Sequence, residues 1–445
     1  MNKHTFLFLS GLLALGACDR TDPSAHSSPQ SSSASSAIPV TLKQDESGHY
    51  WIYREGEPYF IRGAGGTSRL DQLAAAGANS VRTWSTDDAE RILDEAEAQG
   101  LTVMLGLRMG KERHGFDYSD KQAVQAQKER LREQVLRYRD HPALLSWGIG
   151  NELDLFYTDT SVWHAVEDIA RMIRELDPHH LITTVTAGID EEKADLILER
   201  VPSIDYLSIN TYGDLDTLPG KVRDVGWPGA YAVTEWGPTG HWEIANTDWG
   251  VPIEQTSTEK AQAYRQRYES AILGDPEKGL GSYAFLWGQK QETTPTWYGL
   301  FLESGHATEV VDTMQQLWTG EWPTHRAPSI QSFRIDGKTA YDSIYLEPGA
   351  SYEVTLEASH PEDAPFDIRW EFLPESTDIK SGGDREERPE SVSGLIVQDR
   401  GDGRMQFKAP EKKGPYRLFT YVTTEHKKAA TANVPFFVGS AEDHE

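Results

Sequence analysis

The chain of 445 residues has only one cysteine, Cys18, so it cannot form an internal disulfide bond. Basic residues are also scarce, because 43 Lys and Arg stand against 70 Asp and Glu, and the formal net charge is −27. A surface of this sign repels phosphate backbones, and we therefore expect no nucleic-acid partner. Histidine and carboxylate residues form no clustered pattern at predicted strand ends that would suit a catalytic metal. We expect neither a metal nor a cofactor.

Long apolar runs are missing as well, apart from a short one at the N-terminus. Residues 6–14 are apolar and follow Lys3, but they are too few to span a bilayer, which is typical of a secretion signal. The ending Leu-Gly-Ala-Cys resembles the lipobox of bacterial lipoproteins. The resemblance implies that residues 1–18 are a lipoprotein signal peptide and that Cys18 carries a lipid. The protein would then be anchored to a membrane of the cell envelope, in the periplasm or at the cell surface. A free cysteine within an ordinary cleaved signal is the alternative.

The middle of the chain alternates short apolar segments with charged stretches of helical period. Residues 19–38 come first and are rich in Ser and Pro, so we expect a flexible tether there. A hairpin pattern follows, and then eight candidate strands lie at 59–66, 78–84, 101–110, 144–152, 181–188, 204–213, 231–237 and 280–288. This repetition predicts a (β/α)8 TIM barrel over residues 39–322. A doubly wound open sheet is the alternative, although the Gly-rich turn after the first strand lacks GxGxxG spacing.

Beyond Pro323 the pattern contains strands only. Segments such as SYEVTLEAS and YRLFTYVTT alternate apolar and polar residues, with turn residues between them. Residues 323–445 are therefore predicted to form an all-β sandwich with immunoglobulin-like spacing. We interpret this domain as a spacer or a module that packs on the barrel, and carbohydrate binding is the alternative.

Two glutamates stand where a parallel barrel places its active site, at the C-terminal ends of strands. The fourth candidate strand ends in Asn151-Glu152, and the seventh ends in Glu235-Trp236. Cleavage of a glycosidic bond needs such a pair, one carboxyl group that donates a proton and one carboxylate. A separation of about 5–5.5 Å between the two groups would indicate a retaining mechanism.

Several strand ends together resemble the clan of retaining β-glycosidases known as the 4/7 superfamily, glycoside hydrolase clan A. The motifs NE, TEWG, VRTW, NTY and LWG carry the likeness, which covers about residues 40–320, with the barrels of families 2 and 5 nearest. The resemblance implies that Glu152 is the acid/base and Glu235 the nucleophile. The same resemblance and the aromatic strand ends give the expected substrate-binding set: Arg82, Trp84, Asn151, Asn210, Tyr212, Trp236 and Trp287.

Each of these positions also has a structural alternative. Arg82 could pair with a structural carboxylate, whereas Tyr212 and Trp287 could pack at the rim of the barrel. Asn210 stands where many family 5 enzymes have histidine, which leaves the substrate open. Trp147 lies five residues before Glu152, so strand alternation directs it to the opposite face, toward the helices. His179 and His180 follow a helix end and are expected in a solvated turn.

The expected function is that of a retaining glycoside hydrolase acting on a β-linked glycan, such as a β-glucan-like polysaccharide, through a glycosyl-enzyme. Long aromatic loops after the third, seventh and eighth strands indicate a substrate longer than one sugar. A transglycosylase would use the same two glutamates and transfer the sugar to a hydroxyl group instead of water. A non-catalytic glycan-binding lipoprotein is the alternative from another class, and it would have no need of both glutamates.

Overall fold

The computed structural model describes residues 37–443. The expected signal peptide, the lipidation site Cys18 and the tether up to residue 36 lie outside the described residues. None of the helices within residues 37–443 has the length and apolar character needed to cross a membrane.

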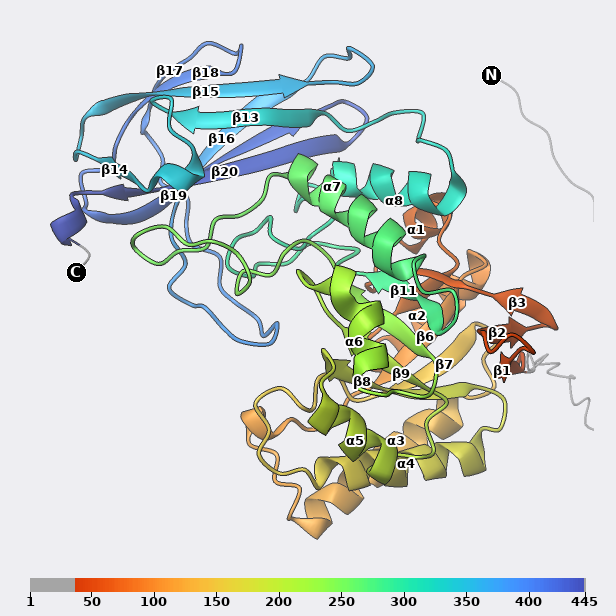
Figure 1. Cartoon of the computed structure of the whole chain (residues 1–445). Helices are drawn as coiled ribbons and strands as arrows, with labels where there is room; N and C mark the ends of the chain where they lie inside the picture. Colours follow the sequence, from red (N-terminus) through yellow and green to blue (C-terminus); the bar gives the residue numbers. More distant parts are fainter. Residues whose placement is uncertain (1–36, 444–445) are drawn as a thin grey trace, which may run out of the picture. The chain divides into compact units, whose positions relative to one another are not determined.

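Eight parallel strands close into a barrel in the order β10-β11-β4-β5-β6-β7-β8-β9 (Figure 1). Their bounds are β4 Ile61–Gly65, β5 Ser80–Arg82, β6 Thr102–Leu107, β7 Leu144–Ile149, β8 Leu181–Ala187, β9 Tyr206–Asn210, β10 Tyr231–Trp236 and β11 Gly279–Ala284. Every one of these strands lies within a segment predicted from the sequence or within one residue of it. The predicted TIM barrel is therefore confirmed, and the open-sheet alternative is excluded.

Helices follow the barrel strands and cover their outer face. They are α1 Leu70–Ala75, α2 Ala89–Ala98, α3 Lys121–Tyr138, α4 Val162–Leu176, α5 Glu191–Arg200, α6 Leu218–Asp224, α7 Ser257–Arg267 and α8 Glu309–Thr319. Side-chain caps start several of them, because the first backbone N–H groups of a helix have no partner within it. Asp120 accepts from the N–H groups of Gln122 and Ala123 at the start of α3, and Thr256 and Glu259 form a capping box at α7.

The strands bury both faces, one inside the barrel and one against the helices. On β7, Trp147 is fully buried among the helices, and its indole N–H donates to Asp177 Oδ2 over 2.7 Å. This agrees with its predicted packing role. His180 is only 1% exposed, and its Nδ1 lies 2.8 Å from the same carboxylate oxygen. The solvated position expected for His180 is therefore wrong, because the carboxylate of Asp177 partners both buried rings, whereas the neighbouring His179 is exposed as expected.

A three-stranded antiparallel sheet covers the N-terminal end of the barrel. It consists of β1 Val40–Gln44, β2 Tyr50–Arg54 and β3 Glu57–Tyr59. Val40 N–H donates to His179 O over 2.7 Å, and Tyr50 N–H donates to Glu277 O over 2.9 Å. The sheet thus seals the end of the barrel opposite the strand ends that bear the predicted site.

The C-terminal region consists of strands arranged in two sheets around an apolar core (Figure 1). One sheet has the order β13-β15-β18-β17, and the other has β12-β20-β19-β16, with β14 also paired to β20. The bounds are β12 Ala307–Thr308, β13 Ser329–Ile335, β14 Ile344–Leu346, β15 Ser351–Ser359, β16 Asp367–Pro374, β17 Ile396–Asp399, β18 Arg404–Lys408, β19 Gly414–Thr423 and β20 Lys428–Val438. The predicted all-β architecture is confirmed. Strand β12 precedes α8 in the chain, so a segment of the barrel region forms the edge of a sandwich sheet.

Short helical turns complete the described chain. They are the 3₁₀ turns η1 Glu112–His114, η2 Leu215–Thr217, η4 Ala340–Asp342 and η5 Ala441–Asp443, and the π-helical turn η3 Tyr268–Ile272 that continues α7.

Candidate active site

A strained turn positions Glu152 immediately after β7. Gly150 and Glu152 both have positive φ angles, of 69° and 50°. A Cβ atom at position 150 would lie 2.5 Å from Leu153 Cδ1, so the turn requires glycine there. The N–H group of Glu152 donates to Val185 O over 2.9 Å, which attaches the turn to β8. A left-handed conformation is unfavourable for glutamate, and strain of this kind concentrates at functional sites.

Glu235 lies near the end of β10, and three donors fix its carboxylate. Arg82 Nη1 and Trp84 Nε1 donate to Oε1 over 2.9 and 2.6 Å, and the Tyr212 hydroxyl donates to Oε2 over 3.0 Å. Arg82 is 1% exposed and Glu235 is 7% exposed, so water screens this ion pair little. Three hydrogen bonds, one of them from a guanidinium, fix the orientation of this carboxylate.

Amide side chains connect the two glutamates. Asn210 Nδ2 donates to Glu152 Oε1 over 2.9 Å, while its Oδ1 accepts from Thr234 Oγ1 over 2.9 Å. Arg82 Nη2 donates to Asn151 Oδ1 over 2.5 Å, so the guanidinium that holds the carboxylate on β10 also holds the turn after β7. The amide orientation of Asn210 is therefore fixed, and Glu152 Oε2 remains available for a proton.

The electrostatic environments of the two glutamates differ. Burial and, second to it, the nearby negative charge of Glu235 raise the pKa of Glu152 from 4.5 to about 7. Lys111 acts in the opposite direction on this pKa. The result is one carboxyl group that holds a proton near neutral pH, beside one carboxylate surrounded by donors. Two carboxylates with divergent environments are the pattern of an acid and a nucleophile.

Both glutamates line one cavity of about 1180 Å³ at the C-terminal end of the barrel. Of the predicted substrate-binding residues, Trp84, Asn151, Asn210 and Tyr212 also line it. Arg82 lies behind Glu235 and contacts it without reaching the cavity surface. The indole of Trp242 is 58% exposed at the cavity, as a flat apolar surface suited to a sugar ring.

Two predicted site residues lie elsewhere, and the expectation for them is corrected. Trp236 is fully buried and packs on Tyr264 and Tyr268, with ring centroids 4.9 and 6.0 Å apart. Strand alternation explains this, because its neighbour Glu235 points into the barrel mouth and Trp236 must point out. Trp287 is 1% exposed, and its ring centroid lies 5.1 Å from that of Phe301.

The chain bends after β11, and this bend decides which aromatic residue reaches the cavity. Trp287 N–H donates to Gly65 O over 2.8 Å, and its indole N–H donates to Arg69 O over 3.1 Å. These bonds hold Trp287 beneath the surface, while Phe285 and Leu286 line the cavity in its place. The sequence motif LWG identified the right segment but the wrong side chain.

Several cavity residues were not foreseen from the sequence. Lys111 lies in the loop after β6, a position at a strand end that could have been singled out. Lys290 and Glu292 follow β11 and form an ion pair at 2.6 Å. Residues 379–384 come from the C-terminal sandwich and also line the cavity. No local pattern signals that contribution.

Comparisons with known proteins agree with this class of site. The sequence profile described as "Glycosyl hydrolases family 2, TIM barrel domain" matches residues 71–222. The "Probable mannan endo-1,4-beta-mannosidase A-2" of Aspergillus terreus is 26% identical over 202 residues, which are 43% of this chain and 46% of the relative. A second A. terreus protein, "Probable mannan endo-1,4-beta-mannosidase C", is 24% identical over 155 residues, 28% of this chain and 37% of the relative. The profile match covers the part of the barrel from α1 to α6.

Solved structures share the fold. A calcium-binding mutant of Bacteroides uniformis beta-glucuronidase 2 has a TM-score of 0.51 at 13% identity, covering 90% of this chain and 48% of that chain. The beta-D-glucuronidase of Dictyoglomus thermophilum has a TM-score of 0.50 at 17% identity, covering 64% and 54%. The chain spans about half the length of these proteins and less than half of the curated relatives.

Proposed function

We propose that the chain is a retaining hydrolase of β-linked glycans, with Glu152 as general acid/base and Glu235 as nucleophile. The observation that carries the proposal is the pair of carboxyl groups on one cavity, one with a raised pKa and one held by three hydrogen-bond donors. Retaining glycosidases use one carboxyl group as a proton donor and the other as a nucleophile.

In the first step, Glu152 donates its proton to the glycosidic oxygen, and Glu235 attacks the anomeric carbon. The bond between that carbon and the oxygen breaks, the leaving alcohol departs, and an ester joins the sugar to Glu235. In the second step, Glu152 removes a proton from water, which attacks the same carbon and breaks the ester. The two inversions leave the β-configuration of the sugar unchanged.

The same charges account for the two roles of Glu152. While Glu235 is ionised, its negative charge raises the pKa of Glu152 and keeps the proton in place. Formation of the ester removes that charge, so the pKa of Glu152 falls when a base is required. Burial and the charge of Glu235 thus prepare the acid form, and the reaction itself prepares the base form.

The size and lining of the cavity support an oligosaccharide or polysaccharide substrate. A volume of about 1180 Å³ exceeds that of one sugar, and Trp84, Tyr212, Trp242 and Phe285 offer aromatic faces. The proposed substrate class is a β-glucan-like glycan, with β-mannans included because of the curated relatives' names. The lipid anchor at Cys18 and a location in the cell envelope remain part of the proposal on sequence grounds.

A slow substrate that traps the ester tests the mechanism. Screening p-nitrophenyl β-glycosides and β-glucan, mannan, xylan and galactan oligosaccharides identifies the sugar. The 2-deoxy-2-fluoro derivative of that sugar, with an activated leaving group, is then expected to label Glu235, as read by peptide mass spectrometry. NMR of the first product is expected to show the β-anomer. A label on another residue, or an α-anomer as the first product, would contradict the proposal, and Glu235→Gln serves as the unlabelled control.

A further inference from the structure

A segment of the C-terminal sandwich forms part of the cavity wall. Residues 379–384 lie in the connection between β16 and β17 and line the cavity that holds both glutamates. The side chain of Ile379 is 50% exposed, which leaves an apolar surface available to a ligand. The barrel alone therefore does not complete the proposed active site.

Ionic and backbone contacts fasten the tip of this segment to the barrel loops. Arg113 binds the carboxylate of Asp384 with two nitrogens, at 2.8 and 3.1 Å, and donates to the carbonyl oxygens of Ser381 and Gly382 at 3.1 Å each. Lys290 Nζ donates to Gly383 O over 2.7 Å. The loop after β6 and the loop after β11 thus both hold the segment, and a bidentate pair adds geometric specificity.

The backbone of the tip fits closely against the barrel. Gly382 and Gly383 have positive φ angles of 62° and 73°. A Cβ atom at position 382 would lie 2.7 Å from Leu155 Cδ2 and 2.9 Å from Arg113 Nη2. Leu155 also lines the cavity, so the glycine allows the sandwich segment to meet the loop after β7. A larger residue would strain this left-handed backbone and would require the side chain of Leu155 or Arg113 to move.

The base of the segment is fixed by a buried carboxylate. Glu386 is 4% exposed, and it accepts from the N–H group of Thr293 over 2.6 Å and from that of Lys380 over 3.0 Å. At the end of β16, Glu375 pairs with Arg417, which also donates to Pro252 O over 2.9 Å. The segment is thus bonded to the barrel region at its base as well as at its tip.

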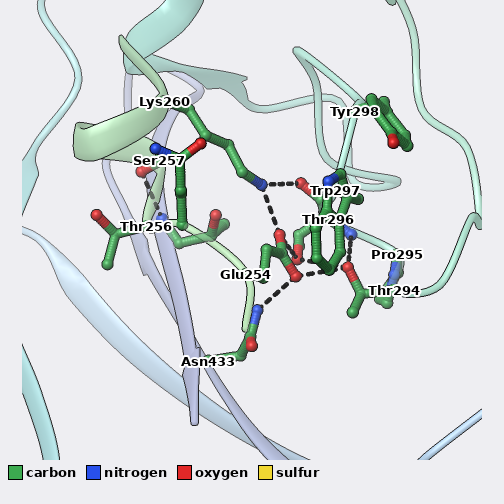
Figure 2. A network of polar contacts seen from close by, with 12 residues as sticks. Glu254, Thr256, Ser257, Lys260, Thr294, Pro295, Thr296, Trp297, Tyr298 and Asn433 are labelled. Carbon is green, nitrogen blue, oxygen red and sulfur yellow. Dashed lines mark hydrogen bonds and ion pairs between the residues drawn. The ribbon is translucent and has the colours of Figure 1, made fainter. Parts of the chain in front are cut away.

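A buried polar network also joins the sandwich to the barrel (Figure 2). Glu254 pairs with Lys260 at 2.5 Å and accepts from Thr294 and from Asn433 of β20, both over 2.6 Å. Thr431 N–H donates to Ser257 Oγ over 2.9 Å. These contacts cross between α7, the loop after β11 and the sandwich, and they are inaccessible to water. They fix the position of the sandwich against the barrel, with residues 379–384 at the cavity.

We propose that residues 379–384 form a subsite that binds a sugar unit linked to the reacting one and thereby selects the oligosaccharides that the protein accepts. The inference rests on the proposed function and assigns the sandwich a role in specificity beyond that of a spacer. The exposed side chain of Ile379 suits the apolar face of a sugar ring. The glycine turn and the Arg113–Asp384 pair are positioning elements for that contact.

Two variants and a matched control test this subsite. Gly382→Ala inserts a Cβ atom where Leu155 lies, and Ile379→Ser removes the exposed apolar surface. Gly401→Ala is the control, because Gly401 has a similar φ of 71° in another sandwich turn, with no atom within 4 Å of its Cβ position. Circular dichroism shows whether each variant folds. If Gly382→Ala does not fold, the result for Ile379→Ser alone tests the subsite, because replacing a half-exposed side chain leaves the fold intact.

The measured quantity is kcat/KM for a tetrasaccharide divided by kcat/KM for the p-nitrophenyl monoglycoside of the same sugar. Cellotetraose and β-1,4-mannotetraose are the probes, each with its matching monoglycoside. We expect this ratio to fall about tenfold in both variants, mainly through KM of the tetrasaccharide, which corresponds to about 1.4 kcal/mol of binding. In the Gly401→Ala control we expect the ratio of the unmodified protein. An unchanged ratio in both variants would overturn the subsite.

Failure of the proposed function has a separate signature. If the unmodified protein cleaves neither probe, the tetrasaccharide affinity is measured by calorimetry for the unmodified protein and for Ile379→Ser. A weaker Kd in the variant would then support the subsite without catalysis, whereas equal affinity or no binding would overturn it.

Discussion

Replacing Glu152 with glutamine separates a catalytic role from a structural one. The pKa of this carboxyl group is raised from 4.5 to about 7 in the folded chain, mainly by burial. The folded state therefore binds the proton more tightly than the unfolded state. The favourable contribution is complete below about pH 4.5 and is lost as the pH rises through about 7.

The magnitude follows from that pKa difference. At about 1.4 kcal/mol per pKa unit, ionised Glu152 destabilises the fold by at most about 3.5 kcal/mol above pH 7. Glutamine carries no charge, and its Oε1 can still accept from Asn210. Glu152→Gln is therefore expected to increase the free energy of unfolding at pH 8 by roughly 1–3 kcal/mol and to leave it nearly unchanged at pH 4.

Turnover should change in the opposite direction. Loss of a general acid costs about 10²–10⁴ in rate, so a glycoside with a poor leaving group should be cleaved at least about a hundredfold more slowly. The assays are urea unfolding at pH 4 and pH 8, and kcat/KM on the best oligosaccharide from the substrate screen. Glu129→Gln, on the exposed face of α3, is the control and should change neither quantity. Destabilisation at pH 8, or turnover close to that of the unmodified protein, would refute the reasoning.

Three further predictions follow from the same structure. The kcat/KM of the unmodified protein should fall about tenfold per pH unit above about pH 7, because Glu152 loses its proton there, and a pH–rate profile checks this. Trp84→Phe removes an indole hydrogen bond to the nucleophile and should lower kcat about 10–100-fold, whereas Trp236→Phe should lower unfolding free energy by about 1–3 kcal/mol with little effect on kcat. Steady-state kinetics and denaturant unfolding of both variants distinguish these outcomes, and similar kinetic losses would contradict the assignment. Glu254→Gln leaves the buried ammonium of Lys260 without its charge partner and should cost about 3–5 kcal/mol in urea unfolding, and a loss below about 1 kcal/mol would contradict this.

The barrel was predictable because its pattern is local and repeated. Each strand is short and apolar and is followed by an amphipathic helix, and these periods survive in the structure with small shifts at the ends. Trp147 could be placed for the same reason, because alternation along one strand needs no knowledge of distant residues. His180 could not, because its burial depends on the carboxylate of Asp177 and on packing around a turn.

Trp236 and Trp287 show where motif reasoning fails. Both belong to segments that reach the site, yet the residue that precedes each of them, Glu235 or Leu286, lines the cavity in its place. For Trp236, strand alternation alone would have predicted burial, because its neighbour Glu235 points toward the cavity. For Trp287, the bend after β11 and the hydrogen bond to Gly65 O decide the outcome, and no periodicity encodes them.

The sequence by itself determined a closed parallel barrel, an all-β C-terminal region and two glutamates at the ends of strands four and seven. It could do so because strand periodicity and the common direction of parallel strands are set by neighbouring residues. Only the tertiary structure decided that the pKa of Glu152 is raised, that Asn210 and Arg82 connect the two glutamates, and that residues 379–384 complete the cavity. Burial and charge interactions depend on distances in space between residues that are far apart in the chain.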